Sequence, residues 1–563
     1  MDLFTSDVHS REWESLAQLR SAFEWDLPDS LNAADRLCDR WARTDGERAA
    51  IYYEDETTDR EGELTFAELA DATDRLAGYL RAVGVEPGDF VAINVARKPE
   101  TLVGHLAAWK LGAVSAPLSV LFGPEALAYR LGDCEPPVAI VDAANVENVR
   151  TAADRTATAG TRLVVGAESL GGESLGADER EFWSAVDAAE PIDSPVETTS
   201  DDPMLLMYSS GTTGPPKGIV QCHRTVVAHL PGAITNYYNL DVAGDEVWWT
   251  PAEWAWGAFL SVMIDALFFG RPIVASESGA PFDPVRACEV LERFETTHAF
   301  LPPSALRLMR QSNVGDREWA FDTFRLLTSG GESLDGETRL WAESFFDVTV
   351  HEGYGSTEMF NHIIGDCTAL EPATPGWMGY ALPGHRIQLL DPETRAPVDV
   401  GETGEIALSR DDPTLFEEYL GRPEATAAAY HGEWYLTGDL ARRNEAGQFQ
   451  HVGRVDDLII CSGYRIGPSE IESALTGHAA VAEVGVVGVP DDERGEVPKA
   501  FVVLDPEHDP SDRLRTELQD YVRDRLASYE YPREIAFVAA LPRTTTGKLK
   551  RGDLTNLPSV EDD

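Results

Sequence analysis

The stretch Met207-Tyr-Ser-Ser-Gly-Thr-Thr-Gly-Pro-Pro-Lys-Gly218 decides how the rest of the chain is interpreted. Its glycines free the backbone to curl, so that N–H groups can converge on phosphate oxygens, while hydroxyls and a lysine add donors and charge. A flexible linker is the common alternative for this composition. However, a chain with only six lysines places Lys217 here, behind two prolines. A Walker loop is disfavoured because Pro216 precedes the lysine and Gly218 follows it, where Gly-Lys-Ser/Thr is required.

The charge of the chain is unusual. Among 563 residues, 97 are acidic and 46 are basic, which gives a net charge of −51, although the 43% hydrophobic content is ordinary. Self-repulsion of this size destabilises a compact fold at low salt and is screened at high salt. The composition resembles that of proteins from extreme halophiles, and an acidic, solubilising surface is the plainer alternative. Nucleic acid and anionic membranes are unlikely partners for such a surface.

The six cysteines, Cys38, Cys134, Cys222, Cys288, Cys367 and Cys461, lie far apart and form no CxxC pair. This spacing disfavours a zinc site or a disulfide framework and favours a reducing compartment. The N-terminus is acidic and lacks the apolar run of a signal peptide. The longest apolar stretch, Gly257 to Gly270, contains Asp265 and is too short to span a bilayer, so it predicts a buried helix. We therefore expect a cytoplasmic protein.

Helix-like and strand-like segments alternate along most of the chain. A capping box at Thr65 and Glu68 predicts a helix that Gly84 ends, and strands are predicted at Phe90–Val95, Val138–Asp142 and Arg162–Val165. Such alternation predicts an α/β fold with largely parallel sheets. The stretch from about Gly166 to Asp202 is rich in Gly, Ser and acidic residues, and we expect it to be a surface connection.

After Asp456 the pattern restarts on a smaller scale. Helices are predicted at 469–475 and about 514–526, with strands at 484–489 and 500–504. The sequence therefore predicts a large domain over residues 1–455 and a small α+β domain over residues 456–563.

Six motifs occur in a fixed order. They are the loop at 207–218, Gly330-Gly-Glu-Ser-Leu334, His351-Glu-Gly-Tyr-Gly-Ser-Thr-Glu358, Tyr435-Leu-Thr-Gly-Asp-Leu440, the stretch from Gly453-Arg-Val-Asp-Asp to Ser462-Gly-Tyr-Arg-Ile-Gly467, and Pro542-Arg-Thr-Thr-Thr-Gly-Lys-Leu549. Together they resemble the adenylate-forming superfamily of acyl- and aryl-CoA synthetases, peptide-synthetase adenylation domains and luciferase-like enzymes. The resemblance covers roughly Leu64 to Leu554 and implies ATP, Mg²⁺ and coenzyme A as reactants and cofactor.

The resemblance also implies roles for particular residues. Lys548 would stabilise charge during adenylate formation, and Glu358 and Thr357 would be the other catalytic residues. Glu358 and Thr212 would hold Mg²⁺. Asp439 would accept the ribose hydroxyls. ATP would be bound by Ser209, Ser210, Gly211, Thr212, Thr213, Gly214, Lys217, Gly331, Glu332, Glu352, Gly353, Tyr354, Gly355, Ser356, Asp439, Arg454 and Arg465, and coenzyme A by Ser462, Gly463, Tyr464 and Arg494. Domain rotation about Asp456 would let one site serve both half-reactions.

The sequence defines the carboxylic acid substrate less well than the reaction. Acetate-specific relatives carry tryptophan at the position of Gly355, so glycine there implies room for a longer chain, and the sequence is most like the medium-chain branch. Trp248, Trp249, Trp254 and Trp256 fall where the family lines its acyl pocket, or are ordinary core aromatics. They could also shorten the pocket or build a site for an aryl acid.

Two further alternatives remain. A luciferase-like oxygenase shares the adenylation half of the motifs, and a non-catalytic nucleotide-binding regulator would not need Lys548 and Glu358. A peptide-synthetase module is disfavoured, because no carrier domain follows Lys548. We expect an acyl-CoA synthetase for short or medium-chain fatty acids, acting as a monomer or homodimer, with an aryl- or branched-acid CoA ligase as the alternative.

Overall fold

The fold was examined in a computed structural model of the chain. The structure describes residue 8 and residues 12–170, 175–209, 215–242, 244–360, 362–461, 464–491, 494–506, 508–526, 531–543 and 549–558, without the side chains of residues 460, 464, 465 and 495. No helix within these ranges combines the length and the apolar content that are needed to cross a bilayer.

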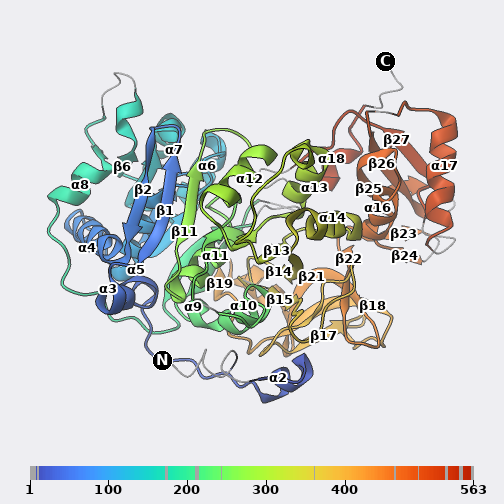
Figure 1. Ribbon diagram of the computed structural model, residues 1–563, viewed down its shortest axis with the longest axis horizontal. Helices are drawn as coiled ribbons and strands as arrows, with labels where there is room; N and C mark the ends of the chain where they lie inside the picture. The colour runs from blue at the N-terminus through green and yellow to red at the C-terminus, as the bar shows by residue number, and fades with distance from the viewer. Residues whose placement is uncertain are drawn as a thin grey trace.

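Two large sheets form the body of the molecule (Figure 1). The first contains, in spatial order, β16 (Tyr380–Ala381), β15 (His362–Gly365), β14 (Thr349–Gly355), β13 (Leu326–Gly330), β12 (His298–Phe300), β10 (Trp248–Trp249), β11 (Ile273–Glu277), β1 (Ala49–Asp55) and β2 (Arg60–Thr65). The second contains β19 (Glu418–Tyr419), β9 (Gly218–Cys222), β8 (Pro203–Tyr208), β4 (Val114–Pro117), β3 (Phe90–Asn94), β5 (Val138–Asp142), β6 (Thr161–Val165) and β7 (Glu179–Glu181). Most neighbouring strands are parallel, which confirms the predicted α/β class.

Helices cover both faces of each sheet. Between the sheets lie α4 (Phe66–Ala82), α5 (Pro99–Lys110), α10 (Leu230–Asn236) and α11 (Gly257–Phe268). The outer face of the second sheet carries α6 (Pro124–Cys134) and α7 (Val146–Thr156), and that of the first carries α12 (Pro284–Arg293), α13 (Pro303–Gln311) and α14 (Gly336–Phe346). Strand alternation produces these layers: Val91 and Ile93 pack between the sheets, and Ala92 packs under the outer helices.

Local signals behave as predicted in two helices. At the start of α4, Thr65 and Glu68 form the capping box, and the helix is followed by Gly84 at a φ of +99°. Helix α11 is buried, and its Asp265 is tolerated there because His229 Nε2 lies 2.7 Å from Asp265 Oδ1. A buried carboxyl needs such a partner to offset the loss of its hydration.

The stretch 166–202 is not merely a surface connection. It contains β7 at the edge of the second sheet and α8 (Phe182–Ala188), whose Phe182 is fully buried. Glu179 is also buried, and it accepts from Arg150 Nη2 at 2.6 Å and from Arg162 Nε at 3.0 Å. The expectation was wrong because an acidic, Gly-rich composition gives no sign that an acidic side chain has two cationic partners.

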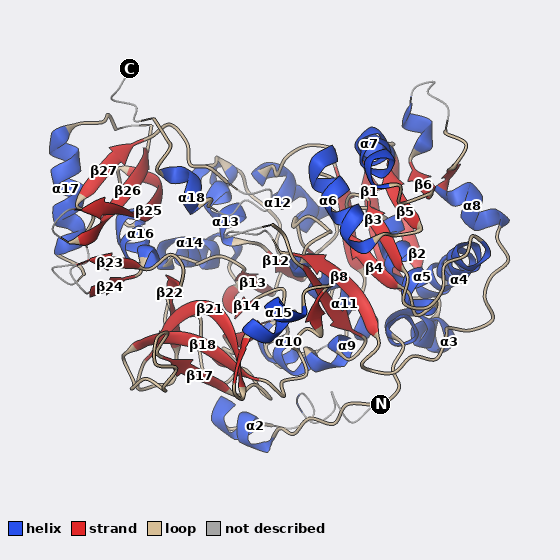
Figure 2. Cartoon of the chain, turned by 180° about the vertical axis from the view of Figure 1, so that it is seen from behind, coloured by secondary structure: helices blue, strands red, loops and turns tan. Residues whose placement is uncertain are grey.

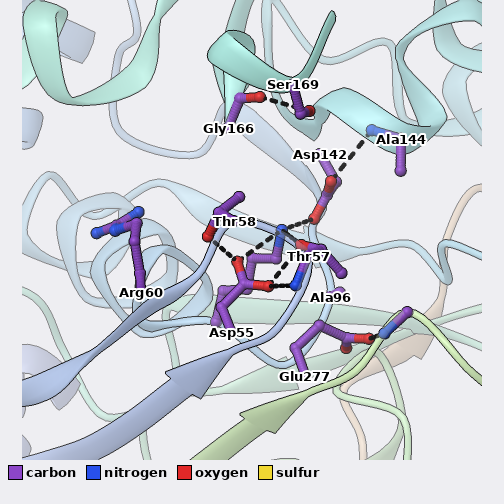
Figure 3. Close-up of polar contacts among 12 residues, drawn as sticks. Asp55, Thr57, Thr58, Arg60, Ala96, Asp142, Ala144, Gly166, Ser169 and Glu277 are labelled. Atoms are coloured by element: carbon purple, nitrogen blue, oxygen red, sulfur yellow. Dashed lines mark hydrogen bonds and ion pairs between the residues drawn. The ribbon is translucent and has the colours of Figure 1, made fainter.

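A cluster of ionic contacts joins the two sheets where their strands end (Figure 3). Lys98 Nζ lies 3.2 Å from Asp55 Oδ2 at the end of β1 and 3.0 Å from Asp142 Oδ2 at the end of β5. The adjacent Arg97 pairs with Glu277, at the end of β11, at 3.2 Å. Two consecutive residues after β3 therefore fix the carboxyl ends of both sheets relative to each other, which positions the loops that follow these strands.

The second half of the chain adds two smaller sheets. The third sheet contains β17 (Ile387–Leu390), β18 (Thr403–Ser409), β21 (Trp434–Arg443), β20 (Tyr430–His431) and β22 (Phe449–Arg454). The fourth contains β24 (Tyr464–Ile466), β23 (Ile459–Cys461), β26 (Gly495–Leu504), β25 (Val481–Asp491) and β27 (Glu534–Phe537), covered by α16 (Pro468–Thr476) and α17 (Asp512–Arg523), with α18 (Arg551–Leu554) following. The remaining helices are α2 (Leu16–Ala22), α3 (Arg40–Asp45), α9 (Thr225–Ala228) and α15 (Pro423–Ala428).

The fourth sheet forms a unit beside α13 and α14, as Figures 1 and 2 show. Residues 455–458 connect it to β22. Among the polar contacts that join it to the body in the described part of the chain, Gln311 Nε2 donates to the Ala482 carbonyl at 3.4 Å, and Arg442 pairs with Glu470. The predicted helices and strands of this region are all present, with longer strands than expected.

Candidate active site

The phosphate-type loop is closed at its base. Its two ends continue β8 and β9, where Tyr208 pairs with Gly218. Ser209 N donates to the Lys217 carbonyl at 3.0 Å, and Lys217 N donates back to Ser209 Oγ at 3.1 Å. Ser210, Gly211, Thr212, Thr213 and Gly214 lie outside the described residues. The base therefore places Lys217 at the carboxyl end of β8, where ligands bind in α/β sheets.

Tyr419 connects Lys217 to Glu358. The ammonium of Lys217 lies 4.4 Å from the centre of the Tyr419 ring, and Tyr419 Oη donates to Glu358 Oε1 at 2.9 Å. Ser356 Oγ donates to the other oxygen of Glu358 at 2.9 Å. The backbone of Thr357 is held by Gln221 Nε2, which donates to its carbonyl at 3.0 Å. One tyrosine thus contacts both a cation and an oriented carboxylate.

Asp439 is held by two donors from different segments. Tyr354 Oη donates to Oδ2 at 2.7 Å, and Arg454 Nη1 donates to Oδ1 at 3.1 Å across the paired strands β21 and β22. Arg454 Nε also contacts Asp456 Oδ1 at 3.2 Å. Burial lowers the pKa of Arg454, but the carboxylates of Asp439 and Asp456 raise it by more. The pKa of Arg454 therefore lies above the ordinary value for arginine. A carboxylate fixed in this way keeps lone pairs for further donors, such as a pair of hydroxyls.

Glu352 presents a buried acceptor beside these groups. The residue is 5% exposed, and Oε2 has no hydrogen-bond partner among the described residues. Burial, followed by the charge of Asp366, raises the pKa of Glu352 to about 8. A buried polar atom without a partner is costly, so Oε2 is suited to receive a donor from a ligand.

The motif residues Gly331 and Glu332 lie in the turn after β13. Gly331 has a φ of +83°, a conformation that glycine adopts without strain. Glu332 forms an ion pair with Arg307 of α13, with 2.7 Å between Nη2 and Oε2.

The predicted residues of the C-terminal unit are only partly described. Arg494 lies 3.7 Å from Asp491 Oδ1 through Nη1, and Arg494 N donates to the same oxygen at 2.9 Å. The backbones of Tyr464 and Arg465 belong to β24, which pairs with β23. Ser462, Gly463 and Lys548 lie outside the described residues. The geometry therefore brings the predicted residues into two groups, one with Lys217 and Glu358 around Tyr419 and one with Tyr354 and Arg454 around Asp439.

The four tryptophans do not line one pocket. Trp248 and Trp249 are consecutive in β10, so their side chains point to opposite faces of the sheet. Trp248 packs between the two sheets, whereas Trp249 belongs to the core under α12 and α13. Trp254 stacks on Phe259 with 3.9 Å between ring centres, and Trp256 is half-buried before α11. The expectation of a shared pocket was wrong for Trp249, because the strand period of two separates neighbours.

Sequence reasoning missed Tyr419 and Arg307. Tyr419 is 61 residues from Glu358, and no local motif marks it. Arg307 pairs with Glu332 from a helix that carries no signature.

A magnesium ion fits the chemistry of this corner. Glu358 offers hard carboxylate oxygens that neighbouring hydroxyls already orient. Mg²⁺ is commonly held by one or two carboxylates together with substrate phosphates.

Comparisons with known proteins agree with this geometry. A profile of the AMP-binding enzyme family matches residues 38–420, and one of the AMP-binding enzyme C-terminal domain matches residues 470–548. An uncharacterized acyl–CoA ligase, YtcI, of Bacillus subtilis is 33% identical over 521 residues, which cover 90% of this chain and 93% of that protein. Human mitochondrial acyl-coenzyme A synthetase ACSM4 is 32% identical over 542 residues, covering 94% of this chain and 90% of the relative.

Solved structures show the same fold. An anthranilate CoA ligase, AuaEII, in complex with anthranoyl-AMP superposes with a TM-score of 0.84 at 26% identity, covering 94% of this chain and 98% of that one. A benzoate CoA ligase from Burkholderia xenovorans gives a TM-score of 0.80 at 28% identity, covering 93% and 99%. Ordered motifs, linked site geometry and matches over nearly the whole length lead to one conclusion: the chain belongs to the family of AMP-binding enzymes.

Proposed function

We propose that this AMP-forming acyl-CoA ligase acts on straight-chain carboxylic acids of roughly three to eight carbons, as a graded series. The enzyme uses ATP, Mg²⁺ and coenzyme A. In the first half-reaction a carboxylate oxygen attacks the α-phosphorus of ATP, an O–P bond forms and pyrophosphate leaves. In the second, the thiol of coenzyme A loses its proton and attacks the acyl carbon, and the C–O bond to AMP breaks.

The contacts that join Lys217, Tyr419 and Glu358 support the proposed activation of the acid with ATP. One tyrosine holds the carboxylate through its hydroxyl and faces the lysine with its ring, at 2.9 Å and 4.4 Å. Lys217 would contact the phosphates of ATP, and Glu358 would hold Mg²⁺. The metal ion would supply charge neutralisation to the leaving pyrophosphate.

The other groups complete a nucleotide site. Asp439 would accept the ribose hydroxyls while Tyr354 and Arg454 hold its two oxygens. Oε2 of Glu352, which has no hydrogen-bond partner among the described residues, would accept a hydrogen bond from the amino group of adenine. Lys548 would stabilise the negative charge that moves during displacement. The role of Lys548 rests on its motif, because its position lies outside the described residues.

The second half-reaction would need the C-terminal unit to turn. We propose residues 1–455 and 456–563 as the two domains, with Asp456 at the hinge. The short connection at 455–458, after which the strands belong to a separate sheet, supports this division. After rotation, Ser462, Gly463 and Tyr464 would line the path of the pantetheine thiol, and Arg494 would meet the nucleotide end of coenzyme A. A cytoplasmic location and a monomer or homodimer remain predictions.

Gly355 supports acids longer than acetate. Glycine at the end of β14 has no side chain to fill the space beside the reacting carboxylate, and each buried methylene contributes about 0.8 kcal/mol. Gly355→Trp is expected to shift kcat/KM toward acetate and propionate. Gly315→Trp, at a position where a Cβ meets open space, is the matched control. A wild type that already prefers acetate would refute the proposed chain length.

An aryl acid is the second candidate. Tyr237, Phe300 and Trp248 form a group of rings behind β13 and β14, with Tyr237 and Phe300 stacked at 6.3 Å. Flat surfaces of this kind favour a planar substrate. Benzoates included in the same kcat/KM series distinguish the two candidates.

A further inference from the structure

Helix α6 contacts both ends of the phosphate-type loop. At the first end, Tyr208 is the last residue of β8, and its Oη donates to Asp133 Oδ2 at 3.1 Å. At the second end, Tyr129 Oη donates to the carbonyl of Pro216 at 2.8 Å. Tyr129 and Asp133 are one turn apart in α6, so their side chains lie on the same face of the helix. One helix therefore sets the positions at which the loop begins and ends.

The peptide group between Pro216 and Lys217 is held at both of its polar atoms. Its oxygen, the carbonyl of Pro216, accepts the hydrogen bond from Tyr129. Its N–H, which belongs to Lys217, donates to Ser209 Oγ at 3.1 Å. Because a peptide group is planar, hydrogen bonds at its two opposite edges fix the plane and the direction in which the Cα of Lys217 leaves it. Proline has no N–H, so the backbone of Pro216 can be held in this way only through its carbonyl.

Arg422 orients the hydroxyl of Tyr129. Arg422 Nη2 donates to Tyr129 Oη, and a guanidinium can only donate. A lone pair of the hydroxyl therefore faces Arg422, which leaves the hydroxyl proton for the carbonyl of Pro216. The same Nη2 lies 3.9 Å from Asp133 Oδ1, so a carboxylate of α6 attracts the guanidinium to this position. Successive hydrogen bonds polarise one another, so the charged donor strengthens the bond from Tyr129 to Pro216.

The segment that contains Arg422 also contacts the side chain of Lys217. Arg422 N donates to the carbonyl of Tyr419 at 2.9 Å, and the ring of Tyr419 lies 4.4 Å from the ammonium of Lys217. Leu420 N donates at 2.8 Å to the carbonyl of Gly218, the residue that follows the lysine. Arg422 therefore connects the tyrosine that holds the backbone before Lys217 to the tyrosine that contacts its ammonium.

We propose that Tyr129 is a positioning residue for adenylate formation. It holds the Pro216–Lys217 peptide group so that the ammonium of Lys217 meets the phosphates of ATP, and Arg422 directs its hydroxyl. This assignment deepens the proposed function and rests on it, because it takes Lys217 as a phosphate contact. Tyr129 acts through Lys217 and takes no part in bond making. Since pyrophosphate has left before coenzyme A attacks, Tyr129 serves the first half-reaction and not the second.

The test measures both half-reactions for Tyr129→Phe, which removes the hydroxyl and keeps the ring. In acid-dependent pyrophosphate release, kcat/KM for ATP should fall about ten-fold, mainly through a higher KM for ATP. Thioester formation from a supplied acyl adenylate should stay unchanged. Tyr521→Phe is the matched control, because Tyr521 Oη also donates to a backbone carbonyl, that of Gly477 at 2.7 Å. This control should leave both half-reactions unchanged.

A double-mutant cycle tests whether Tyr129 acts through Lys217. Lys217→Ala alone should raise the KM for ATP, and adding Tyr129→Phe to it should change that KM no further, because no ammonium is left to position. Losses that multiply independently would overturn the positioning role. Should Tyr129→Phe fail to fold, Arg422→Gln must raise the KM for ATP in the same half-reaction, and an unchanged KM would overturn the assignment.

Failure of the proposed function gives a different result. If Lys217→Ala leaves pyrophosphate release and the KM for ATP unchanged, Lys217 does not contact the phosphates, and both assignments are refuted. If Lys217→Ala is impaired while Tyr129→Phe has wild-type kinetics, only the role of Tyr129 is refuted.

Discussion

Tyr419 donates a hydrogen bond to Glu358, with 2.9 Å between Oη and Oε1, although Tyr419 lies in β19 of the second sheet and Glu358 in the turn after β14 of the first. Tyr419 pairs with Ile219 of β9, the strand that follows the phosphate-type loop. The contact thus ties the carboxylate to the segment that would hold the phosphates. Loss of this hydrogen bond should lower the catalytic rate more than it lowers the free energy of unfolding.

Tyr419→Phe removes the hydroxyl and keeps the ring beneath Lys217. A hydrogen bond to a charged group contributes about 1.5–3 kcal/mol, so kcat/KM for acid-dependent pyrophosphate release should fall about ten-fold or more. Tyr430→Phe is the control, because Tyr430 packs against Phe416 in the same aromatic group. Equal effects of the two variants would show that the loss comes from packing.

Glu352→Gln should change how stability depends on pH. Between the ordinary glutamate pKa of 4.5 and about 8, the folded protein binds more protons than the unfolded chain, so the wild type loses stability as pH rises through that window. The glutamine variant lacks this titration. Its free energy of unfolding relative to the wild type should therefore increase with pH and level off above about 8.

Urea unfolding across this pH range measures the difference in free energy of unfolding between the variant and the wild type. Glu318→Gln, at an exposed position, is the control and should give a constant difference. A constant difference for Glu352→Gln as well would mean that Glu352 is ionised in the folded protein.

Much of the fold followed from local patterns. The capping box at Thr65, the buried strand at Val138–Asp142 and the helices of the C-terminal unit depend on neighbouring residues, and all are present. Asp439 and Glu358 were likewise predicted from their sequence context, and their roles stay predictions. The structure adds their partners.

The missed features are contacts between distant segments. The burial of Glu179 depends on Arg150 and Arg162, and the placement of Glu358 depends on Tyr419. No local window contains both members of such a pair. The separation of Trp248 and Trp249 was predictable, since a strand places consecutive side chains on opposite faces.

Salt should stabilise the protein strongly. The excess acidic side chains, which give a net charge of −51, repel one another in the folded state. The length over which salt screens this repulsion falls to about 3 Å at 1 M salt. The Tm should rise steeply from low to molar KCl. An isosmotic sucrose series controls for solute exclusion, and a flat KCl profile would remove the halophilic interpretation.

Lys548→Ala should abolish adenylate formation, by about 10²-fold or more, and largely spare thioester formation from a supplied acyl adenylate. The ammonium is needed while the α-phosphate is attacked and not afterwards. Lys550→Ala is the matched control, because Lys550 pairs with Asp553 at 2.9 Å. Equal losses in both half-reactions would assign Lys548 a different role.

The central claim is that the acid is activated as its adenylate at this site. A substrate acid labelled with ¹⁸O in its carboxylate tests it directly, with products separated and their masses measured. Attack on the α-phosphorus forms a bridge through a carboxylate oxygen, so AMP should carry one labelled oxygen per acyl-CoA formed, with none in pyrophosphate. Unlabelled AMP, or ADP and labelled phosphate in its place, would contradict the account.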